Sequence, residues 1–446
     1  MKLKQSRDNL LNSVSFLGIC LWFSVPLVSG VTGIKAVAVL VALWGLSARP
    51  GALGKSVVRH MWLILWYAYM CLLLVLGVWT YGQMEPLGFF PGVALFGLGS
   101  VFMKYYELNG NSALLSRAFI VSIIGWAVGS LISIFQLLRY PLASRMLATG
   151  EQTDVDYSAL GIGGFGFVYG SILVVVGLIY LLRTKLRHRA GLKPVLILSL
   201  AAIVAFVIAS QYATALLLLG LAGGVALVAP RSRRALLATL ATAALTAFLL
   251  IGHVGGLLTR LAESLPEAAV ARDKILDVAR GFGGGGFGDQ SAYRMELYAR
   301  SFKEFIKSPV FGQTTSLLPG DLGGHSAWVD LLGAFGVVGS LPLLFFLLSQ
   351  AWRRVHRSGQ SLFGSTLIIA YLYVIVLGFI NPVIYLSQIG FALFFIVPAA
   401  SIITAGSDDD SRKLETGLLR FEGQLVPGDG RRGSRDRRVR VLPLTS

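Results

Sequence analysis

The residues best suited to chemistry lie between Asp321 and Gly339, in the stretch "DLGGHSAWVDLLGAFGVVG". His325 is one of only five histidines in the chain, and it precedes a long apolar run. Spacing alone favours a histidine that merely opens a helix near water. Positive charge is disfavoured at a helix N-terminus, however, so this imidazole would be neutral and able to accept a proton. The same position therefore suits a general base.

Ser326 and Asp330 stand close to this histidine in sequence and raise the question of a nucleophilic triad. A Ser-His-Asp arrangement is disfavoured, because Ser326 adjoins its would-be base and Asp330 lies on another face of the helix. We keep Asp330 and Gly324 as residues that support His325, not as reacting groups.

Arginines on the same predicted side of the membrane are the second clue to chemistry. They are Arg139, Arg145, Arg260, Arg272, Arg280, Arg294 and Arg300. Guanidinium groups bind phosphate oxygens in a bidentate manner, so a diphosphate is a natural ligand for such a set. The alternative for each is a salt bridge, which for Arg300 would be to Glu296 or Glu304 at helical spacing. Arg139 and Arg145 have no acid between them, whereas we prefer the salt bridge for Arg260, Arg272 and Arg280.

No metal or cofactor site is expected from the sequence. The chain shows no His, Cys or carboxylate cluster with ligand spacing, and no paired Asp motif on an outer loop. The glycine-rich stretch "GFGGGGFGDQS" lacks the Lys-Ser/Thr end of a phosphate-binding loop and follows no predicted strand. We therefore interpret that stretch as a flexible lid or hinge.

The composition indicates an all-α membrane protein. Apolar residues make up 55% of the 446 residues and charged residues 14%, whereas an average soluble domain carries about 25% charge. Apolar windows of about 20 residues, the length that crosses a bilayer as a helix, recur along most of the chain. The net charge of +17 could suggest nucleic acid. Asymmetric loops of a membrane protein explain it more simply, so no nucleic-acid partner is expected.

We expect about twelve transmembrane helices in a polytopic arrangement. They lie near 12–29, 32–48, 60–80, 87–104, 116–137, 160–182, 194–209, 212–229, 235–252, 325–350, 362–380 and 385–404. Lys and Arg gather in alternate loops, including "RTKLRHRAGLK", "RSRR" and "RRVHR", whereas the opposite short loops "SGVTG", "YGQMEP", "ASQY" and "INPVIYLS" carry none. By the positive-inside rule both termini are cytoplasmic.

The predicted spans divide the chain into parts. Residues 1–405 form a transmembrane helical domain, and residues 253–324 form one large outward-facing helical loop within it. A stripe of this loop at helical spacing contains Tyr298, Phe302, Phe305 and Ile306. Residues 406–446 are polar, Gly-rich and mixed in charge, which predicts a disordered cytoplasmic tail.

Two motifs lie between Ser291 and Leu343. The first is an arginine that opens a helix ending in Pro, two apolar residues and Gly, here "YRMELYARSFKEFIKSPVFGQ". The second is a histidine, a small polar residue, apolar residues and then Gly-x-x-Gly, here "GGHSAWVDLLGAFGVVGS". In their order, their separation and their place between the large loop and a late span, these motifs resemble the catalytic region of the O-antigen ligase and O-antigen polymerase superfamily.

The resemblance implies a metal-independent glycosyltransferase of the bacterial inner membrane. Its donor would be an undecaprenyl-diphosphate-linked oligosaccharide, and its acceptor would be a hydroxyl of a glycan or glycolipid at the periplasmic face. His325 and Arg294 would be catalytic. The diphosphate would be bound by Arg139, Arg145, Arg294 and Arg300, among the surrounding membrane lipids.

One departure from the family's pattern bears on the acceptor. The family often has an arginine after a Ser in the outer turn before the eighth span, whereas this turn reads "ASQYATALLLL", with Gln211 in that place. We therefore slightly favour a polymerase, with a chain-length regulator as a partner, over a ligase that acts on lipid A–core. Gln211 and Tyr298 are kept as supporting residues.

A lipid-linked oligosaccharide flippase is the alternative from another class of protein. A flippase would be expected to have charged residues deep in its spans and an internal repeat, and the sequence favours neither feature.

Overall fold

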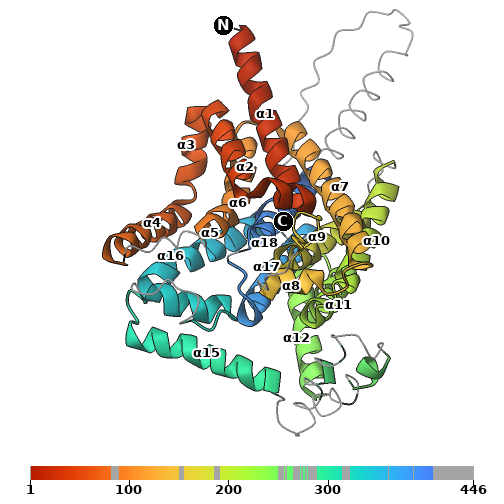
Figure 1. Ribbon diagram of the computed structural model, residues 1–446. Coiled ribbons are helices and arrows are strands. Elements are labelled where there is room, and N and C mark those ends of the chain that lie inside the picture. The colour runs from red at the N-terminus through yellow and green to blue at the C-terminus, as the bar shows by residue number, and fades with distance from the viewer. Residues whose placement is uncertain are drawn as a thin grey trace, which may run out of the picture. The chain divides into compact units, whose positions relative to one another are not determined.

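The computed structural model describes residues 2–81, 90–149, 155–184, 191–249, 256, 259–264, 272, 275–276, 279, 289–313, 322–359, 361–384 and 386–404. These residues form helices and no β-strand (Figure 1). In chain order the helices are α1 (Lys2–Ser24), α2 (Pro26–Ser47), α3 (Pro50–Val58), α4 (Met61–Tyr81), α5 (Phe90–Phe96), α6 (Leu98–Leu108), α7 (Ser112–Leu137), α8 (Ala143–Thr149), α9 (Phe165–Arg183), α10 (Leu192–Ala209), α11 (Ala213–Val228), α12 (Arg233–Leu249), α15 (Asp289–Lys307), α16 (Ala327–Arg357), α17 (Leu362–Ile380) and α18 (Ser387–Phe391), which continues through the π-helical turn η3 (Ala392–Ile396).

Seven helices in the described part of the chain are long and apolar enough to cross a membrane. They are α2, α7, α9, α10, α16, α17 and the helix Ser387–Thr404. The pair α3 and α4 passes the same test only together and bends by 84° between its halves. The prediction of an all-helical, multi-pass membrane protein is therefore confirmed. The number twelve stays a prediction, because the other expected spans fall on α1, α5 with α6, α11 and α12, which are shorter, broken or less apolar.

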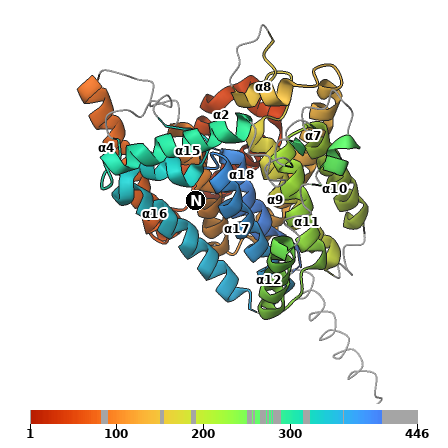
Figure 2. The same ribbon diagram turned by 90° about the horizontal axis from the view of Figure 1, so that it is seen from below.

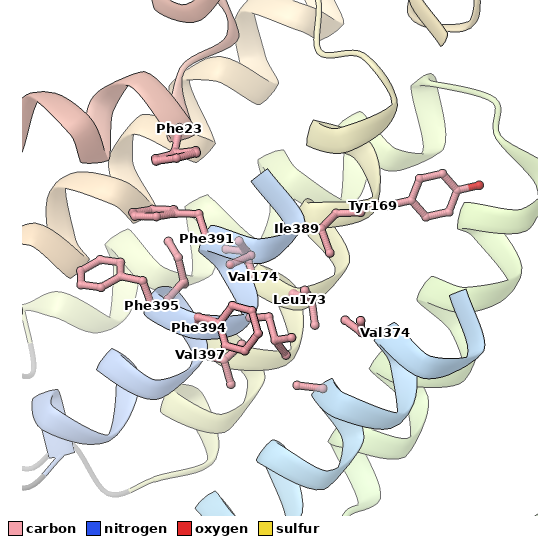
Figure 3. Close-up of a cluster of buried hydrophobic side chains, with 14 of the residues drawn as sticks. Phe23, Tyr169, Leu173, Val174, Val374, Ile389, Phe391, Phe394, Phe395 and Val397 are labelled. Atoms are coloured by element: carbon pink, nitrogen blue, oxygen red, sulfur yellow. The ribbon is translucent and has the colours of Figure 1, made fainter. Parts of the chain in front are cut away.

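The core of the fold surrounds α9, whose residues from Gly166 to Leu181 are all buried. Figure 3 shows Leu173 and Val174 of α9 among the side chains of the last helix, including Phe394. Because α9 is enclosed by protein, its apolar sequence reflects core packing and not only contact with lipid.

A glycine breaks one of the expected spans. The run near 87–104 forms α5 and α6, which meet at Gly97. A Cβ at Gly97 would lie 2.6 Å from Cδ2 of Leu63 on α4, so the two segments pack closely at this break. The hydropathy pattern does not reveal the break.

Contacts sort the ends of the helices into two groups. The first group, which we call the basic end, consists of residues 49–60, 104–111, 183–184, 226–234, 350–359 and 361–363. Its segments are joined by Arg183 Nη1, which donates to Ala226 O at 2.7 Å, and by Arg353 Nη1, which donates to Arg59 O at 3.1 Å. These are the segments that the positive-inside rule assigns to one side of the membrane.

The second group, which we call the site end, consists of residues 138–149, 155–165, 209–213, 322–327, 380–384 and 386–387. Ser144 Oγ donates to Gly163 O at 2.6 Å, and the Tyr212 hydroxyl donates to Ser144 O at 2.6 Å. Ala327 N donates to Asn381 O at 3.2 Å. The structure thus brings together the loops that the sequence assigns to the opposite side from the basic end, while the membrane side of each end stays a prediction.

Candidate functional site

The start of α16 is fixed by its own side chains. Ser326 is the N-cap, and its Oγ accepts from Val329 N at 3.4 Å. Asp330, one turn further on, accepts from Ser326 N at 3.0 Å through Oδ2. Polar N-cap side chains of this kind satisfy amide groups that the first helical turn leaves without partners. The local sequence "HSAWVD" therefore fixes where the helix begins and places His325 just outside it.

Helix α15 packs against α16 through a buried hydroxyl, and the two helices lie side by side in Figure 2. Ser301 Oγ donates to Asp330 Oδ1 at 2.5 Å and accepts from Gly323 N at 2.8 Å. Gly323 itself lies against α15, since a Cβ there would be 2.1 Å from Leu297 O. The "GGHS" segment is thereby held between the two helices.

His325 is half-buried, and its Nδ1 lies 3.1 Å from Gly323 O. A carbonyl oxygen can only accept, so this hydrogen bond places the imidazole proton on Nδ1. Nε2 then carries the lone pair and can accept a proton from another group. Gly324, directly before it, has φ +69° and open space around the position of a Cβ. Glycine is required there by the left-handed backbone, which lets the chain turn into His325.

Arg294 lies on the half-buried face of α15, one turn from Leu297 and Tyr298. Its charge acts on the hydroxyls of Tyr298 and of Tyr169 on α9. Tyr298 in turn is within electrostatic range of Asp330, and Asp330 is within range of His325. Burial raises the pKa of Tyr298, Arg294 opposes that rise, and Asp330 adds to it. Arg294 and His325 are therefore linked only indirectly, through Tyr298 and Asp330, and no hydrogen bond or ion pair within the described residues joins them.

A second arginine reaches the same group through two tyrosines. The rings of Tyr169 and Tyr212 have their centroids 6.0 Å apart. Arg145 of α8 acts electrostatically on Tyr212, whose hydroxyl donates to Ser144 O at 2.6 Å. Arg145 is half-buried. Arg145 and Arg294 therefore approach this pair of tyrosines from α8 and from α15.

Gln211 lies in the turn before Tyr212 and has φ +56°, the only positive φ of a non-glycine residue in the part of the chain that the structure describes. Its backbone N donates to Ile208 O at 3.2 Å, and the residue is half-buried. Non-glycine residues adopt such a backbone at a cost of about 1–3 kcal/mol and are enriched near functional sites. The turn that presents Tyr212 is thus locally strained.

Two of the predicted phosphate ligands lie outside this group. Arg139 is exposed and stands 5.7 Å from the ring of Phe135. Arg300 is exposed and pairs with Glu296 at 3.4 Å, which is the salt bridge that its helical spacing allowed. Neither is linked to His325 by an interaction within the described residues, and their proposed role in diphosphate binding stays a prediction.

The two sequence motifs meet at a break in α16. Gly336 has φ +59° and interrupts the helix, and its missing Cβ leaves room for Gly312, whose N would be only 2.4 Å away. The Pro-x-x-Gly end of the first motif supplies backbone hydrogen bonds at this break. They are Gln313 N to Gly333 O at 3.0 Å, Val337 N to Pro309 O at 2.9 Å and Val338 N to Val310 O at 3.0 Å. The segment after α15 thus satisfies backbone groups that the interrupted helix cannot.

Sequence inspection missed several polar residues at the site end. Tyr169, Tyr212 and Ser301 take part in the contacts above, and Asn381 lies beside the start of α16. Asn381 is 6% exposed, and its Nδ2 has no hydrogen-bond partner among the described residues. A lone polar residue beside apolar spans, as in "INPVIYLS", was the available signal for Asn381. Tyr169 and Tyr212 stand in apolar runs, where a tyrosine is typical of an ordinary core residue, so the sequence offered no signal for either of them.

Several predictions lie outside the described residues, namely the glycine-rich stretch 281–288, most of the loop 253–288 and the tail 406–446. Within the described residues, no group of three or more His, Cys, Asp and Glu side chains is placed to hold a metal ion. No family profile matches the chain, and no curated protein sequence matches it either.

Proposed function

We propose that this protein is a membrane glycosyltransferase of the O-antigen polymerase and ligase type. The observation that supports the proposal is the junction of the two motifs: Ser301 of α15, the helix that carries Arg294, bonds both to Asp330 of α16 and to Gly323 beside His325. Arg294 and His325 thus come from different motifs that are held against each other. The proposed location is the bacterial inner membrane, with the site end at the periplasmic face and both termini in the cytoplasm.

The donor in this proposal is an oligosaccharide linked to undecaprenyl diphosphate. Arg294 binds the diphosphate, with Arg145 at the far side of Tyr169 and Tyr212, and their charges stabilise the leaving group as the bond to the anomeric carbon breaks. His325 Nε2 accepts the proton of the acceptor hydroxyl while its oxygen forms the new glycosidic bond. In-line attack inverts the anomeric centre, and the proton leaves later from the imidazole to water.

The acceptor is proposed to be another lipid-linked repeat unit, which makes the enzyme a polymerase working with a chain-length regulator. Gln211 supports this choice, because the turn before α11 lacks the arginine often found there in the family. The alternative acceptor is lipid A–core, which would make the protein a ligase. Both reactions use the same donor chemistry at His325 and Arg294.

The test is replacement of His325 and of Arg294 by Ala, separately, with surface glycan displayed on a gel. General acid–base residues contribute typically about 10²–10⁴-fold, so His325→Ala is expected to abolish long glycan. His356→Ala is the matched control, since His356 is exposed at the basic end and stacks on Trp352 with ring centroids 5.8 Å apart. Lys303→Ala is the control for Arg294→Ala, because Lys303 is exposed on the same helix.

Unchanged glycan in both variants, with normal membrane insertion, would exclude the proposed enzyme. Lipid-linked units stranded on the cytoplasmic side would instead favour a transporter. Single repeat units on lipid A–core would favour the polymerase, whereas free lipid-linked polymer would favour the ligase.

A further inference from the structure

A recess with several charged side chains in its lining lies at the basic end, at the opposite end of α16 from His325. It has a volume of about 240 Å³ and receives residues from the α3–α4 junction, α6, α16, α17 and the last helix. Ligand pockets for drug-sized molecules measure roughly 300–1,000 Å³. This recess is therefore suited to a small group, such as a phosphate with its immediate substituents. It takes no part in the proposed glycosyl transfer.

Positive charge dominates the lining of the recess. Its cationic residues are Arg59, Lys104, Arg353, Arg354 and Arg357. The only carboxylate in the lining is Glu107, which is already paired with Lys104 at 2.9 Å. In the part of the chain that the structure describes, no carboxylate pairs with the four arginines. Among the described residues, the recess therefore combines five cationic side chains with a single carboxylate.

Two of the arginines, Arg353 and Arg354, are half-buried, whereas Arg59 and Arg357 are exposed. Arg353 donates to Ser349 O at 3.2 Å through Nε and to Arg59 O at 3.1 Å through Nη1, so two arginine-bearing segments are tied together. Arg354 Nε is buried and has no hydrogen-bond partner among the described residues. A buried donor without a partner is unfavourable, and a bound acceptor would remove that cost.

The positive-inside rule accounts for basic residues on one side of a membrane but not for their convergence. It requires only that Lys and Arg stay in the loops of that side, as exposed Arg117 does at the start of α7. Here arginines from two separate segments line one recess, and the Arg353 guanidinium bonds to the backbone of the segment that carries Arg59. Guanidinium groups are suited to bind phosphate oxygens.

We propose that this recess binds a phosphate group at the basic end of the protein. The phosphate belongs either to an anionic phospholipid headgroup at the membrane surface or to a soluble phosphate compound. Both sources offer the same oxygen acceptors to Arg354 and its neighbours, so the experiment must separate them.

The experiment uses the full-length protein purified in detergent and measures its melting temperature by intrinsic fluorescence. Phosphatidylglycerol is titrated into the micelles against phosphatidylcholine as the neutral control. Inorganic phosphate is titrated separately against sodium chloride at equal ionic strength. A rise in melting temperature with phosphatidylglycerol alone identifies a lipid headgroup, and a rise with inorganic phosphate identifies a soluble ligand. Either result supports the site if the following variants respond as expected.

Arg354→Gln and Arg357→Gln are expected to weaken the apparent affinity for the effective probe roughly tenfold each, by removing a charge-assisted hydrogen bond. Arg117→Gln is the matched control and is expected to respond as the unchanged protein does. If Arg354→Gln fails to fold, the exposed Arg357→Gln carries the test. The proposal is overturned if neither probe shifts the melting temperature, or if Arg357→Gln and Arg117→Gln respond equally.

Discussion

Ser301 of α15 donates its hydroxyl proton to Asp330 of α16 across 2.5 Å, and neither side chain is exposed. The same hydroxyl accepts from Gly323 N at 2.8 Å. One buried oxygen therefore joins the helix that carries Arg294, the loop that carries His325 and the first turn of the following span. The candidate site depends on a residue that itself is not placed to touch a substrate.

Replacement of Ser301 by Ala is expected to loosen this junction. It leaves the carboxylate of Asp330 and the amide of Gly323 each with one partner fewer, which costs about 1–3 kcal/mol per buried group. We expect a lower melting temperature in detergent and shorter or weaker surface glycan. Lys303→Ala, on the exposed face of the same helix, is the control for loss of a side chain from α15. Equal melting temperatures for Ser301→Ala and Lys303→Ala would show that the junction contributes nothing.

Gly336→Ala tests the break in α16. A Cβ at Gly336 would lie 2.4 Å from Gly312 N and 2.5 Å from Val310 O, and its φ of +59° is itself unfavourable for alanine. Gly359 has almost the same φ, +60°, but nothing lies within 4 Å of the position of its Cβ. Gly359→Ala should therefore lower stability by only about 1–2 kcal/mol, the cost of a left-handed alanine.

The expected result is a much larger fall in melting temperature, or loss of folded protein, for Gly336→Ala. Size-exclusion chromatography followed by thermal denaturation measures both. A fall no greater than that of Gly359→Ala would mean that the contact between the two motifs does not stabilise the fold.

Arg145 and Arg139 are expected to differ, although both were candidates for the diphosphate. Arg145 is half-buried and acts on Tyr212, whereas Arg139 is exposed over the ring of Phe135. A charged hydrogen bond to a phosphate contributes about 1.5–3 kcal/mol, so Arg145→Ala should slow transfer roughly tenfold or more. The effect of Arg139→Ala should be clearly smaller. The measurement is transfer from a lipid-linked donor with purified variants, and the reverse order of effects would contradict this assignment.

Tyr298→Phe tests whether the site uses this tyrosine as a neutral donor. Burial raises its pKa above the ordinary value of 10.0. A raised folded-state pKa means that its contribution to stability is fully present below the unfolded value and is lost only as the pH rises through the folded one. At neutral pH the hydroxyl is therefore protonated. Its loss should reduce transfer roughly two- to tenfold, the effect of one hydrogen bond.

The shape of the pH profile between about 6 and 8, where histidine titrates, should be the same for Tyr298→Phe as for the unchanged protein. Initial rates at a series of pH values measure it. A midpoint that moves in the variant would show that Tyr298 changes the pKa of the titrating group. Its role would then not be limited to a hydrogen bond with the proposed lipid-linked substrate.

Hydropathy predicts the helices that are bounded by polar residues. The expected span 362–380 coincides with α17, Leu362–Ile380, and the expected span 194–209 differs from α10, Leu192–Ala209, only at its start. Both are apolar runs between charged or polar loops, so their limits are visible in the sequence alone.

The breaks and the orientation of α15 could not be predicted in this way. Gly97 and Gly336 interrupt helices because of what packs against them from distant segments. The stripe expected on α15 included Phe302 and Ile306, yet these are 53% and 62% exposed, while Ser301 faces inward. The inward position of Ser301 depends on Asp330, a partner 29 residues away in sequence. The spacing of apolar residues along a helix predicts only contacts between apolar faces. The contact that orients α15 is a hydrogen bond between polar side chains, so this spacing did not predict it.

The bonds around Gly336 have a mechanical consequence. Three backbone hydrogen bonds fasten the chain after α15 to the interrupted part of α16, so α15 cannot swing away as an independent lid without leaving backbone groups unpaired. One of these bonds reaches Gly333, before the break, and two reach Val337 and Val338, after it, so the chain after α15 bridges both halves of α16. Gly336 is therefore expected to act as a braced corner and not as a free hinge, with α15 and both halves of α16 moving together.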